Sequence, residues 1–297
     1  MIWLTGSQGM LGRLVATELS AAGLPLHATD REVDLTDHRA LAAGAPPEAP
    51  AWVINCAAYT AVDRAESERE AAWALNCDAV AHLARYCSTV GARMVHISTD
   101  YVFDGERPHG EGYHEEAPVN PQSVYGRSKA AGEGALREEL AAHLIIRTAW
   151  LYAEHGHNFL LTMLRLLARR QELTVVNDQH GCPTYARDLA GAIVHLIGCL
   201  EPPTGTVHFT NAGVTTWYDY ACRIQQSALE LGLLPVSRTI APVSSDQYPT
   251  AAQRPACSVL ECRRIREQYG ITPRAWQQAL DDCLARLAAA SNISTER

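Results

Sequence analysis

Short apolar runs alternate with longer stretches of helical spacing over the first half of the chain. Apolar residues recur every three or four positions within Met10–Leu19 and Ala72–Tyr86, which predicts amphipathic helices. Between such stretches lie short apolar and β-branched runs, which we predict to be strands: Ile2–Thr5, Pro25–Ala28, Trp52–Cys56, Arg93–Ser98 and Leu144–Thr148. Because strands that are apolar throughout are typical of a parallel sheet with both faces covered, the pattern predicts a doubly wound α/β fold.

After about Trp150 the pattern changes to helical stretches that are separated by proline-containing loops such as Thr239–Thr250. We predict a smaller C-terminal region that closes over the carboxyl edge of the sheet. Helices are expected there over Phe159–Arg170, Arg187–Leu200, Trp217–Leu231 and Thr272–Ala289.

The composition is that of a globular, acidic chain, with 297 residues, a net charge of −8 and 47% hydrophobic residues. An acidic chain lacks the basic face that nucleic acids and anionic membranes require, so we expect neither as a partner. No apolar run reaches the length of a membrane span, and the sequence opens on a predicted strand without a signal-peptide pattern. Nine cysteines without a C-x-x-C pair indicate reduced thiols in a cytoplasmic protein, and neither a disulfide framework nor a zinc site.

The basic residues are almost entirely arginine: the chain has 24 arginines and one lysine, Lys129. A guanidinium is planar and keeps its proton, so a site that needs a compact ammonium does not accept arginine. Lys129 is therefore a candidate functional residue before any motif is considered.

Three glycines, Gly6, Gly9 and Gly12, follow the first predicted strand and open the first predicted helix. Glycines allow a tight turn and a close approach of the backbone to a pyrophosphate, which binds the N–H groups of a helix N-terminus. The spacing G-x-x-G-x-x-G indicates dinucleotide binding, although any turn from a strand into a helix can carry glycines. We expect a bulky residue at Gly9 or Gly12 to abolish cofactor binding and to leave the fold intact.

Two charged residues follow the second predicted strand. Asp30 suits the ribose hydroxyls of a dinucleotide, or alternatively the cap of a turn. Arg31 comes next and suits a 2′-phosphate, so the sequence leaves the choice between NAD and NADP open.

Tyr125 and Lys129 are one helical turn apart in the sequence YGRSK, so their side chains share a helix face. An ammonium beside a phenol is expected to lower the phenol pKa, which favours proton transfer near neutral pH. The alternative is an ordinary solvent-facing pair. Upstream, a buried strand ends in Thr99 and Asp100, at the edge where open α/β sheets place their ligands. Thr99 suits polarising a carbonyl beside the tyrosine; alternatively, both residues cap the following turn.

These features together resemble the dTDP-4-dehydrorhamnose reductase family of the extended short-chain dehydrogenase/reductase superfamily. The resemblance covers nearly the whole chain. The segments that carry it are Thr5–Gly12, Val53–Asp63, Ser98–Gly105, Tyr125–Lys129, Ile146–Tyr152, Gly181–Thr184, and Arg254-Pro255 with Ser258.

The resemblance implies a Rossmann-type sheet that binds NADPH or NADH through residues 1–149, with segments near 185–210 packing back onto it and a mainly substrate-binding region over 150–297. It implies that Tyr125 donates a proton and that Lys129 binds the nicotinamide ribose, with Thr99 as the third catalytic residue. The implied cofactor contacts, besides Tyr125 and Lys129, are Gly6, Gly9, Met10, Leu11, Gly12, Asp30, Arg31, Asp34, Leu35, Ala57, Ala58, Tyr59 and Thr60. The implied contacts to a nucleotide sugar are Thr99, Asp100, Trp150, Asn158 and Arg254, of which the last two are alternatively structural.

The chain departs from the family pattern at two places. In some members of the family, glutamates hold a magnesium ion that bridges a dimer. The matching positions here are Leu14 and Arg187, which offer no oxygen ligand. We therefore expect no metal, and a monomer or a homodimer without a metal bridge. Related 4,6-dehydratases carry Thr-Asp-Glu and use the Asp/Glu pair for elimination. This chain has Tyr101 in place of the glutamate, so it lacks the base that elimination needs.

The function implied by the resemblance is NAD(P)H-dependent reduction of the C4 ketone of a dTDP-6-deoxy-4-keto-L-sugar, as in the synthesis of dTDP-L-rhamnose. One alternative is a reductase of a different nucleotide-linked deoxysugar, such as one destined for an antibiotic. Another is a non-catalytic regulatory subunit like the β subunit of methionine adenosyltransferase. The complete set of Thr99, Tyr125 and Lys129 favours an enzyme.

Overall fold

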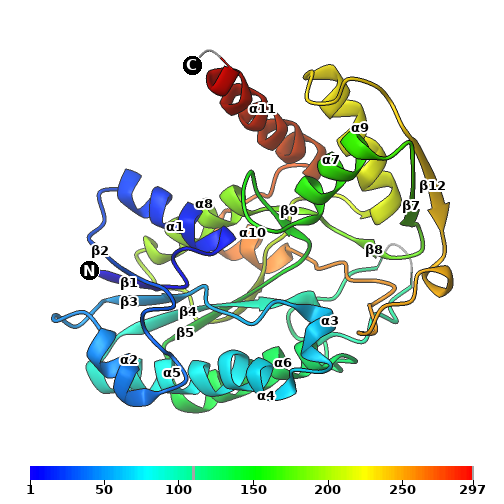
Figure 1. The fold of residues 1–297 in the computed structure, drawn as a ribbon. Helices are drawn as coiled ribbons and strands as arrows, with labels where there is room; N and C mark the ends of the chain where they lie inside the picture. Colours follow the sequence, from blue (N-terminus) through cyan, green and yellow to red (C-terminus); the bar gives the residue numbers. More distant parts are fainter. Residues whose placement is uncertain (109–110, 296–297) are drawn as a thin grey trace.

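A parallel sheet of six strands forms the centre of the protein in the computed structural model, which describes residues 1–108 and 111–295 (Figure 1). The strands lie in the order β2-β1-β3-β4-β5-β10. Their bounds are β1 Ile2–Thr5, β2 Leu26–Thr29, β3 Trp52–Asn55, β4 Arg93–Thr99, β5 His143–Thr148 and β10 Gly205–His208. The five strands predicted from the sequence are all present, each displaced at its ends by no more than one residue, so the predicted fold class is confirmed.

Helices cover both faces of the sheet because successive strand residues point to opposite sides and are apolar on both. Ile2 and Leu4 of β1 pack with α1 (Met10–Ala21) and α8 (Ala186–Ile197) on one face, whereas Trp3 packs with α5 (Ala79–Val90) on the other. Figure 1 shows α1 and α8 above the sheet and the second layer below it. That layer comprises α2 His38–Gly44, α3 Val62–Ala65, α4 Arg69–Trp73, a π-helical turn Ala74–Asp78, α5, and α6 Val124–Glu139.

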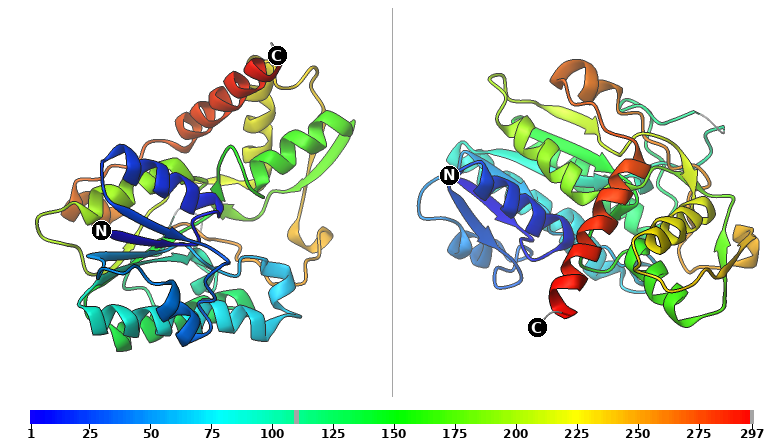
Figure 2. Two further views of the ribbon diagram at one scale, coloured as in Figure 1. Left: turned by 60° about the vertical axis from the view of Figure 1, so that its left-hand side comes forward. Right: turned by 90° about the horizontal axis from the view of Figure 1, so that it is seen from above.

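The C-terminal part contributes to both the sheet and a second cluster. From the segment 185–210, α8 packs on α1, and β10 pairs in parallel with β5. The other elements gather beside the carboxyl edge of the sheet, as the two views of Figure 2 show. They are β6 Leu151–Tyr152, α7 Phe159–Arg169, β7 Glu172–Val176, β8 His180–Gly181, β9 Thr184–Tyr185, β11 Thr215–Thr216, α9 Trp217–Glu230, β12 Thr239–Val243 and α11 Trp276–Thr295. Helix α10 (Arg263–Tyr269) instead packs on β10, and its Ile265 belongs to the same core cluster as residues of α1 and α8. The assignment of cofactor and substrate to residues 1–149 and 150–297 stays a prediction.

The predicted loop Thr239–Thr250 is wrong in its first half. Residues Thr239–Val243 form β12, which pairs in parallel with β7. Pro242 lies within this strand, where it removes one backbone donor, and the two-stranded sheet tolerates it because β12 has an edge without a partner strand. Proline therefore concealed a strand from the sequence pattern.

The direction in which strands are added reverses between β1 and β3, which are neighbours in the sheet. Helices that follow these two strands lie on opposite faces, so a crevice opens outside their carboxyl ends. The glycine loop follows β1, and residues 57–60 follow β3. Among the described residues, no helix has the length and apolar character needed to cross a membrane.

The close approach of α6 to the π-helical turn depends on one glycine. A Cβ atom added at Gly132 would lie 2.0 Å from the carbonyl oxygen of Asn76, whereas one added at Gly134 would meet no atom within 4 Å. We expect Gly132→Ala to lower the free energy of unfolding by about 1–3 kcal/mol, the usual cost of overpacking. Gly134→Ala, the matched control in the same helix, should raise it by up to about 1 kcal/mol through helix propensity. Denaturant unfolding of both variants checks this, and equal effects would contradict it.

Candidate active site

The glycine loop turns sharply between β1 and α1. Gly6 has φ 68°, and a Cβ atom there would lie 2.5 Å from the backbone nitrogen of Ala57, so the loop touches the segment after β3. Gly9 is the N-cap of α1, and no side chain caps this helix. The helix N-terminus therefore presents backbone N–H groups and a positive dipole end at the switch point of the sheet, the arrangement that binds phosphates.

The three glycines serve different purposes. A Cβ atom at Gly12 would lie 2.1 Å from the carbonyl oxygen of Gly6, so Gly12 allows α1 to pack on the loop itself. The expectation that a bulky residue at Gly12 leaves the fold intact is therefore wrong. At Gly9, by contrast, the nearest atom lies 3.2 Å away and the residue is exposed, so a side chain there would point into the space in front of the helix.

Asp30 ties the end of β2 to the glycine loop. Its carboxylate accepts hydrogen bonds from the backbone nitrogens of Gln8 (2.7 Å) and Arg31 (2.9 Å). The turn-capping alternative is thus present, and it places the carboxylate beside the loop. Farther along, Thr36 donates two hydrogen bonds to Asp34, which lower the pKa of that carboxyl, and Leu35 is buried in the core.

The loop Ala57–Thr60 is held by an asparagine of the π-helical turn. Asn76 accepts a hydrogen bond from the backbone nitrogen of Tyr59 at 2.8 Å and donates one to its carbonyl at 3.0 Å. It also donates to the Ser128 hydroxyl at 3.0 Å, so the same side chain joins this loop to α6. The loop is thereby fixed between the glycine loop and the helix that carries Tyr125.

Helix α6 brings Tyr125 and Lys129 into the interior. Ser123 caps the helix by accepting a hydrogen bond from the nitrogen of Gly126, and a Cβ atom at Gly126 would lie 2.2 Å from the carbonyl oxygen of Tyr101. Tyr125 and Lys129 are only 9% and 1% exposed. The alternative of a solvent-facing pair is therefore wrong.

Thr99 and Asp100 lie next to Tyr125 at the end of β4. Thr99 accepts a hydrogen bond from the nitrogen of Tyr101 (3.2 Å), so it does cap the following 3-10 turn Asp100–Val102, and it also bonds Tyr125 and the Asp100 carboxylate. Burial raises the pKa of Asp100 to about 6, against hydrogen bonds from Thr99 and Ser258. Burial raises the pKa of Tyr125 as well, and its hydrogen bond with Thr99 opposes this only in part.

Lys129 does not act on Tyr125 in this structure as the sequence suggested. Its side-chain nitrogen Nζ lies 2.7 Å from the carbonyl oxygen of Ile97 and 3.2 Å from Nε2 of His96. The expected lowering of the Tyr125 pKa is wrong for this arrangement, because burial dominates. Burial also lowers the pKa of Lys129 to about 8, although Glu133 and Cys56 act in the opposite direction.

Trp150, at the end of β5, has a strained backbone and a stacked ring. Its φ of 47° makes it the one residue other than glycine with positive φ in the described part of the chain. The ring stacks on that of Trp217, with centroids 3.5 Å apart and planes within 7°, and it fills the space where Gly181 lacks a side chain. Strain of this kind persists where surrounding packing enforces it and is frequent at functional sites.

The two weaker substrate candidates have structural partners. Asn158 caps α7, and its amide nitrogen donates to the carbonyl oxygens of Ala153 and His155, which accounts for its polar atoms. Arg254 donates to the hydroxyl of Tyr101 at 2.9 Å and to Asp63 at 2.8 Å, so it reaches the edge of the site through the ring that contacts Tyr125.

Sequence reasoning did not identify four residues that build this site: Asn55, Asn76, His96 and Trp217. Asn55 and His96 lie inside predicted strands, and their polar side chains in otherwise apolar runs were the available signal. The contacts of Asn76 and Trp217 connect segments that are far apart in the sequence, so spacing along the chain does not disclose them.

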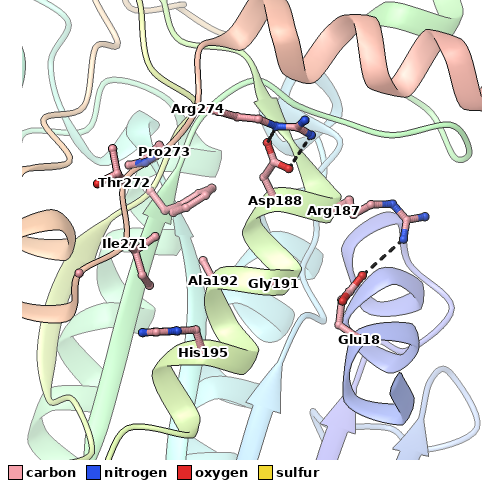
Figure 3. A pocket seen from close by; sticks show the side chains of 12 residues that line it. Glu18, Arg187, Asp188, Gly191, Ala192, His195, Ile271, Thr272, Pro273 and Arg274 are labelled. Atoms are coloured by element: carbon pink, nitrogen blue, oxygen red, sulfur yellow. Dashed lines mark hydrogen bonds and ion pairs between the residues drawn. The ribbon is translucent and has the colours of Figure 1, made fainter. Parts of the chain in front are cut away.

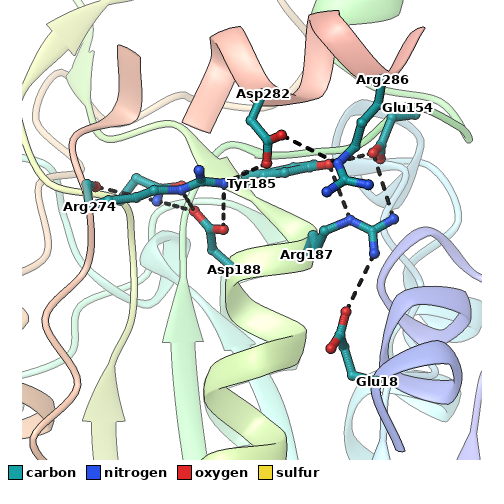
Figure 4. A network of polar contacts seen from close by, with 9 residues as sticks. Glu18, Glu154, Tyr185, Arg187, Asp188, Arg274, Asp282 and Arg286 are labelled. Atoms are coloured by element: carbon teal, nitrogen blue, oxygen red, sulfur yellow. Dashed lines mark hydrogen bonds and ion pairs between the residues drawn. The ribbon is translucent and has the colours of Figure 1, made fainter. Parts of the chain in front are cut away.

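The region around Arg187 lies elsewhere, on the face covered by α1 and α8. A pocket of 510 Å³ is lined there by α1, α8 and the segment before α11, and none of the predicted catalytic residues borders it (Figure 3). Arg187 lies between the carboxylates of Glu18 (3.4 Å) and Glu154 (3.8 Å), within a network that includes Arg274 paired with Asp188 (Figure 4). In residues 1–108 and 111–295, no group of three or more His, Cys, Asp or Glu side chains is arranged to hold a metal ion.

The chain is similar to known proteins over nearly its full length. The family described as "RmlD substrate binding domain" matches residues 1–289. The spore coat polysaccharide biosynthesis protein SpsK of Bacillus subtilis is 38% identical, with 97% of this chain and 98% of that protein aligned. The dTDP-4-dehydrorhamnose reductase of Escherichia coli is also 38% identical, with 98% and 99% aligned.

Solved structures agree with these relatives. The dTDP-4-dehydrorhamnose reductase of Bacillus anthracis, in complex with NADP, has a TM-score of 0.90 and 35% identity, and the match covers 96% of this chain and 98% of that one. A UDP-glucose 4-epimerase of Thermus thermophilus, 21% identical with a TM-score of 0.81, shares the fold. The chain therefore belongs to the RmlD substrate binding domain family, which confirms its resemblance to the dTDP-4-dehydrorhamnose reductases.

Proposed function

We propose that this protein reduces the C4 ketone of a dTDP-6-deoxy-4-keto-L-sugar with NADPH or NADH, as relatives named dTDP-4-dehydrorhamnose reductase do, and yields dTDP-L-rhamnose. The observation that carries the proposal is the buried group of Thr99, Tyr125 and Lys129 at the carboxyl edge of the sheet, next to an uncapped helix N-terminus. A proton donor and a phosphate-binding loop at one switch point are what hydride transfer from a dinucleotide requires.

The residues of the first crevice fit a dinucleotide. Gly9, Met10 and Leu11 open α1 and would receive the pyrophosphate on their backbone N–H groups. Asp30, held beside the loop by Gln8, would accept hydrogen bonds from the adenosine ribose, with the exposed Arg31 available for a 2′-phosphate. The fixed loop Ala57–Thr60 would line the path toward the nicotinamide, and Asp34 and Leu35 would lie at the adenine edge.

The reduction needs one hydride, which the nicotinamide supplies when bound, and one proton, which the protein delivers. Tyr125 is the proposed proton donor to the C4 oxygen. Thr99, already hydrogen-bonded to Tyr125, would orient that oxygen when its hydroxyl proton turns from the Asp100 carboxylate to the substrate. Burial keeps Tyr125 protonated until the substrate accepts its proton, because an isolated phenolate is disfavoured there.

The sugar nucleotide would bind between this edge and the C-terminal elements. The stacked rings of Trp150 and Trp217 form an apolar surface at the end of β5, suited to the face of a sugar ring or a base. Asp100 would accept a hydrogen bond from a sugar hydroxyl. Arg254, already paired with Asp63, would contribute charge toward the diphosphate, whereas the amide of Asn158 is used by its own loop.

We further propose a cytoplasmic enzyme that acts as a monomer or as a homodimer without a metal bridge. All nine cysteines are free in the structure, as a reducing compartment requires. Arg187 is already paired with two carboxylates and offers no ligand to a divalent cation.

A direct assay tests the proposed activity. The protein is incubated with dTDP-4-keto-6-deoxy-L-sugar, and oxidation of NADPH and NADH is followed separately. Turnover with either coenzyme supports the proposal. Turnover only with another keto sugar in a substrate panel would assign a different deoxysugar, and binding of a catalytic partner without turnover on any keto sugar would favour a regulatory subunit.

The first prediction that follows from this proposed function concerns the phosphate loop. Gly9→Val should lower dinucleotide affinity by more than about tenfold, or 1.4 kcal/mol, because the side chain occupies the space in front of α1. The fold should remain, since the extended backbone at Gly9 accepts valine and the nearest atom is 3.2 Å from its Cβ position. Gly191→Ala, at an open position on α8, is the control. Unchanged affinity in a dinucleotide titration would exclude a phosphate role for this loop.

The second prediction concerns proton transfer. Tyr125→Phe should lower kcat by about 10²–10⁴, the usual contribution of a positioned acid, with coenzyme affinity retained. Lys129→Arg should lose activity and coenzyme affinity as Lys129→Met does. The buried space between Ile97 and His96 suits the compact head group of a lysine rather than a planar guanidinium. Steady-state kinetics and coenzyme titration of the three folded variants check this. A Lys129→Arg enzyme with the wild-type rate and pH profile would contradict the proposal that Lys129 binds the nicotinamide ribose beside Tyr125.

The third prediction concerns metals. Neither magnesium nor a chelator should change activity or assembly, because Leu14 and Arg187 stand where the resemblance places acidic ligands. Activity and gel-filtration volume with each additive give the result. A dimer that dissociates on addition of chelator would show that the metal bridge exists with other ligands.

A further inference from the structure

Four buried side chains form a continuous line from the first strand to Lys129. Parallel register places Thr5 of β1 opposite Asn55 of β3, and Asn55 opposite His96 of β4. Thr5 bonds Asn55 at 2.9 Å, Nδ2 of Asn55 lies 3.2 Å from Nδ1 of His96, and Nε2 of His96 lies 3.2 Å from Nζ of Lys129. All four residues are at most 1% exposed.

The direction of these hydrogen bonds follows from one backbone amide. The nitrogen of Ala57 can only donate, and it lies 3.0 Å from Oδ1 of Asn55, which fixes the orientation of that amide group. Nδ2 of Asn55 therefore faces His96, and an amide NH2 only donates. Nδ1 of His96 is accordingly the acceptor, so a neutral His96 carries its proton on Nε2.

The proton on Nε2 points toward Lys129, and this restricts the form of the lysine. An ammonium has three donors and no acceptor, so it would present N–H against N–H. A neutral amine has a lone pair that accepts from Nε2 and two hydrogens that donate. One of these bonds the carbonyl oxygen of Ile97 at 2.7 Å, and the other is left for a ligand. With a neutral amine at Lys129, every hydrogen bond along the line from Thr5 to Lys129 therefore pairs a donor with an acceptor.

We propose that His96 is a positioning residue, oriented by Asn55, that stabilises the neutral amine of Lys129 and so allows this lysine to change its protonation within the working pH range of the enzyme. The inference rests on the proposed function for its significance in the reaction, but the protonation state itself is a property of the chain. Lys129 would then be more than a fixed positive charge beside Tyr125.

The other surroundings of Lys129 also affect the balance between its amine and ammonium forms. Glu133 on α6 and Cys56 after β3 favour the ammonium, whereas burial disfavours it and prevails, which brings the pKa of Lys129 to about 8. Burial holds the pKa of His96 well below its usual value, and the charge of Lys129 lowers it further whenever the lysine is protonated, so His96 is neutral with either form of Lys129. His96 therefore acts on Lys129 through its hydrogen bond rather than through a charge.

The single lysine makes the test direct. Protein grown with 15N-labelled lysine gives one side-chain Nζ signal, that of Lys129, and its pH titration by NMR yields the pKa without substrate or coenzyme. His96→Leu should raise this pKa by about one unit, a tenfold change in the ratio of ammonium to amine. The apparent pKa in the pH–rate profile that reports Lys129 should shift upward by the same amount.

A second variant changes one atom instead of removing the ring. Asn55→Asp keeps Oδ1 for Ala57 and replaces the donor Nδ2 by an acceptor, so the His96 proton should move to Nδ1 and Nε2 should accept from the ammonium. The new charge alone would also raise the Lys129 pKa, and the 15N shifts of His96 therefore decide whether the tautomer has changed. His27→Leu is the control, because His27 is a half-buried sheet histidine that contacts Gly44 and Trp3 and not Lys129.

The outcomes are distinct. A wild-type His96 protonated on Nε2, with a Lys129 pKa that rises in His96→Leu and stays constant in His27→Leu, supports the inference. A wild-type His96 protonated on Nδ1, or a Lys129 pKa that is unchanged or lower in His96→Leu, overturns it. Since the NMR measurement needs no turnover, absence of reductase activity would refute the proposed function and leave this result standing.

Discussion

The buried ion pair between Glu133 and Arg147 is the contact on which the geometry of the site depends. Arg147 of β5 donates two hydrogen bonds to the Glu133 carboxylate of α6, at 2.7 and 2.8 Å, and Ser98 of β4 donates another at 2.6 Å. Burial alone would raise the pKa of Glu133. The hydrogen bonds and the charge of Arg147 outweigh burial and bring the pKa below its usual value, so the carboxylate stays ionised. Because removing one partner of such a pair typically costs about 3–5 kcal/mol, the pair fixes the rotation of α6 over the sheet.

That rotation determines where the chemistry lies. Lys129 precedes Glu133 by one turn, and Tyr125 precedes Lys129 by another, so all three project from the same helix face. With Glu133 anchored over β4 and β5, Lys129 reaches β4, and Tyr125 reaches the strand end at Thr99. Gly126 and Gly132 let α6 approach Tyr101 and the π-helical turn closely, because a Cβ atom at either position would collide with the backbone there.

Much of this could be predicted from the sequence, because hydrophobic periodicity and glycine spacing are local. The five strands, the glycine loop and the helix of Tyr125 and Lys129 were of this kind. The strand β12 was missed because Pro242 is unusual in a strand, and the purpose of Gly12 was misjudged because its close neighbour, the carbonyl of Gly6, appears only when the loop folds back. The pKa of Tyr125 was misjudged because spacing along a helix does not measure burial.

The remaining features depend on strand register, which no local pattern contains. Asn55 and His96 become partners only because β3 lies between β1 and β4 in the sheet. The stack of Trp150 on Trp217 likewise joins the end of β5 to the start of α9. Such residues can be recognised in a sequence as polar or aromatic side chains that interrupt an otherwise apolar pattern. Which residues they contact depends on the order of the strands and on how the elements pack.

The scarcity of lysine also has a practical consequence for this protein. Its surface cations are guanidiniums, which reagents that acylate amines leave untouched, and the one lysine side chain is 1% exposed. Apart from the α-amino group, acylation of an amine can therefore proceed only when a local opening exposes the Lys129 side chain to the reagent. The rate at which that single amine is modified would report the local opening of the site around Lys129, and its slowing by a bound dinucleotide would report how firmly the ligand holds the site closed.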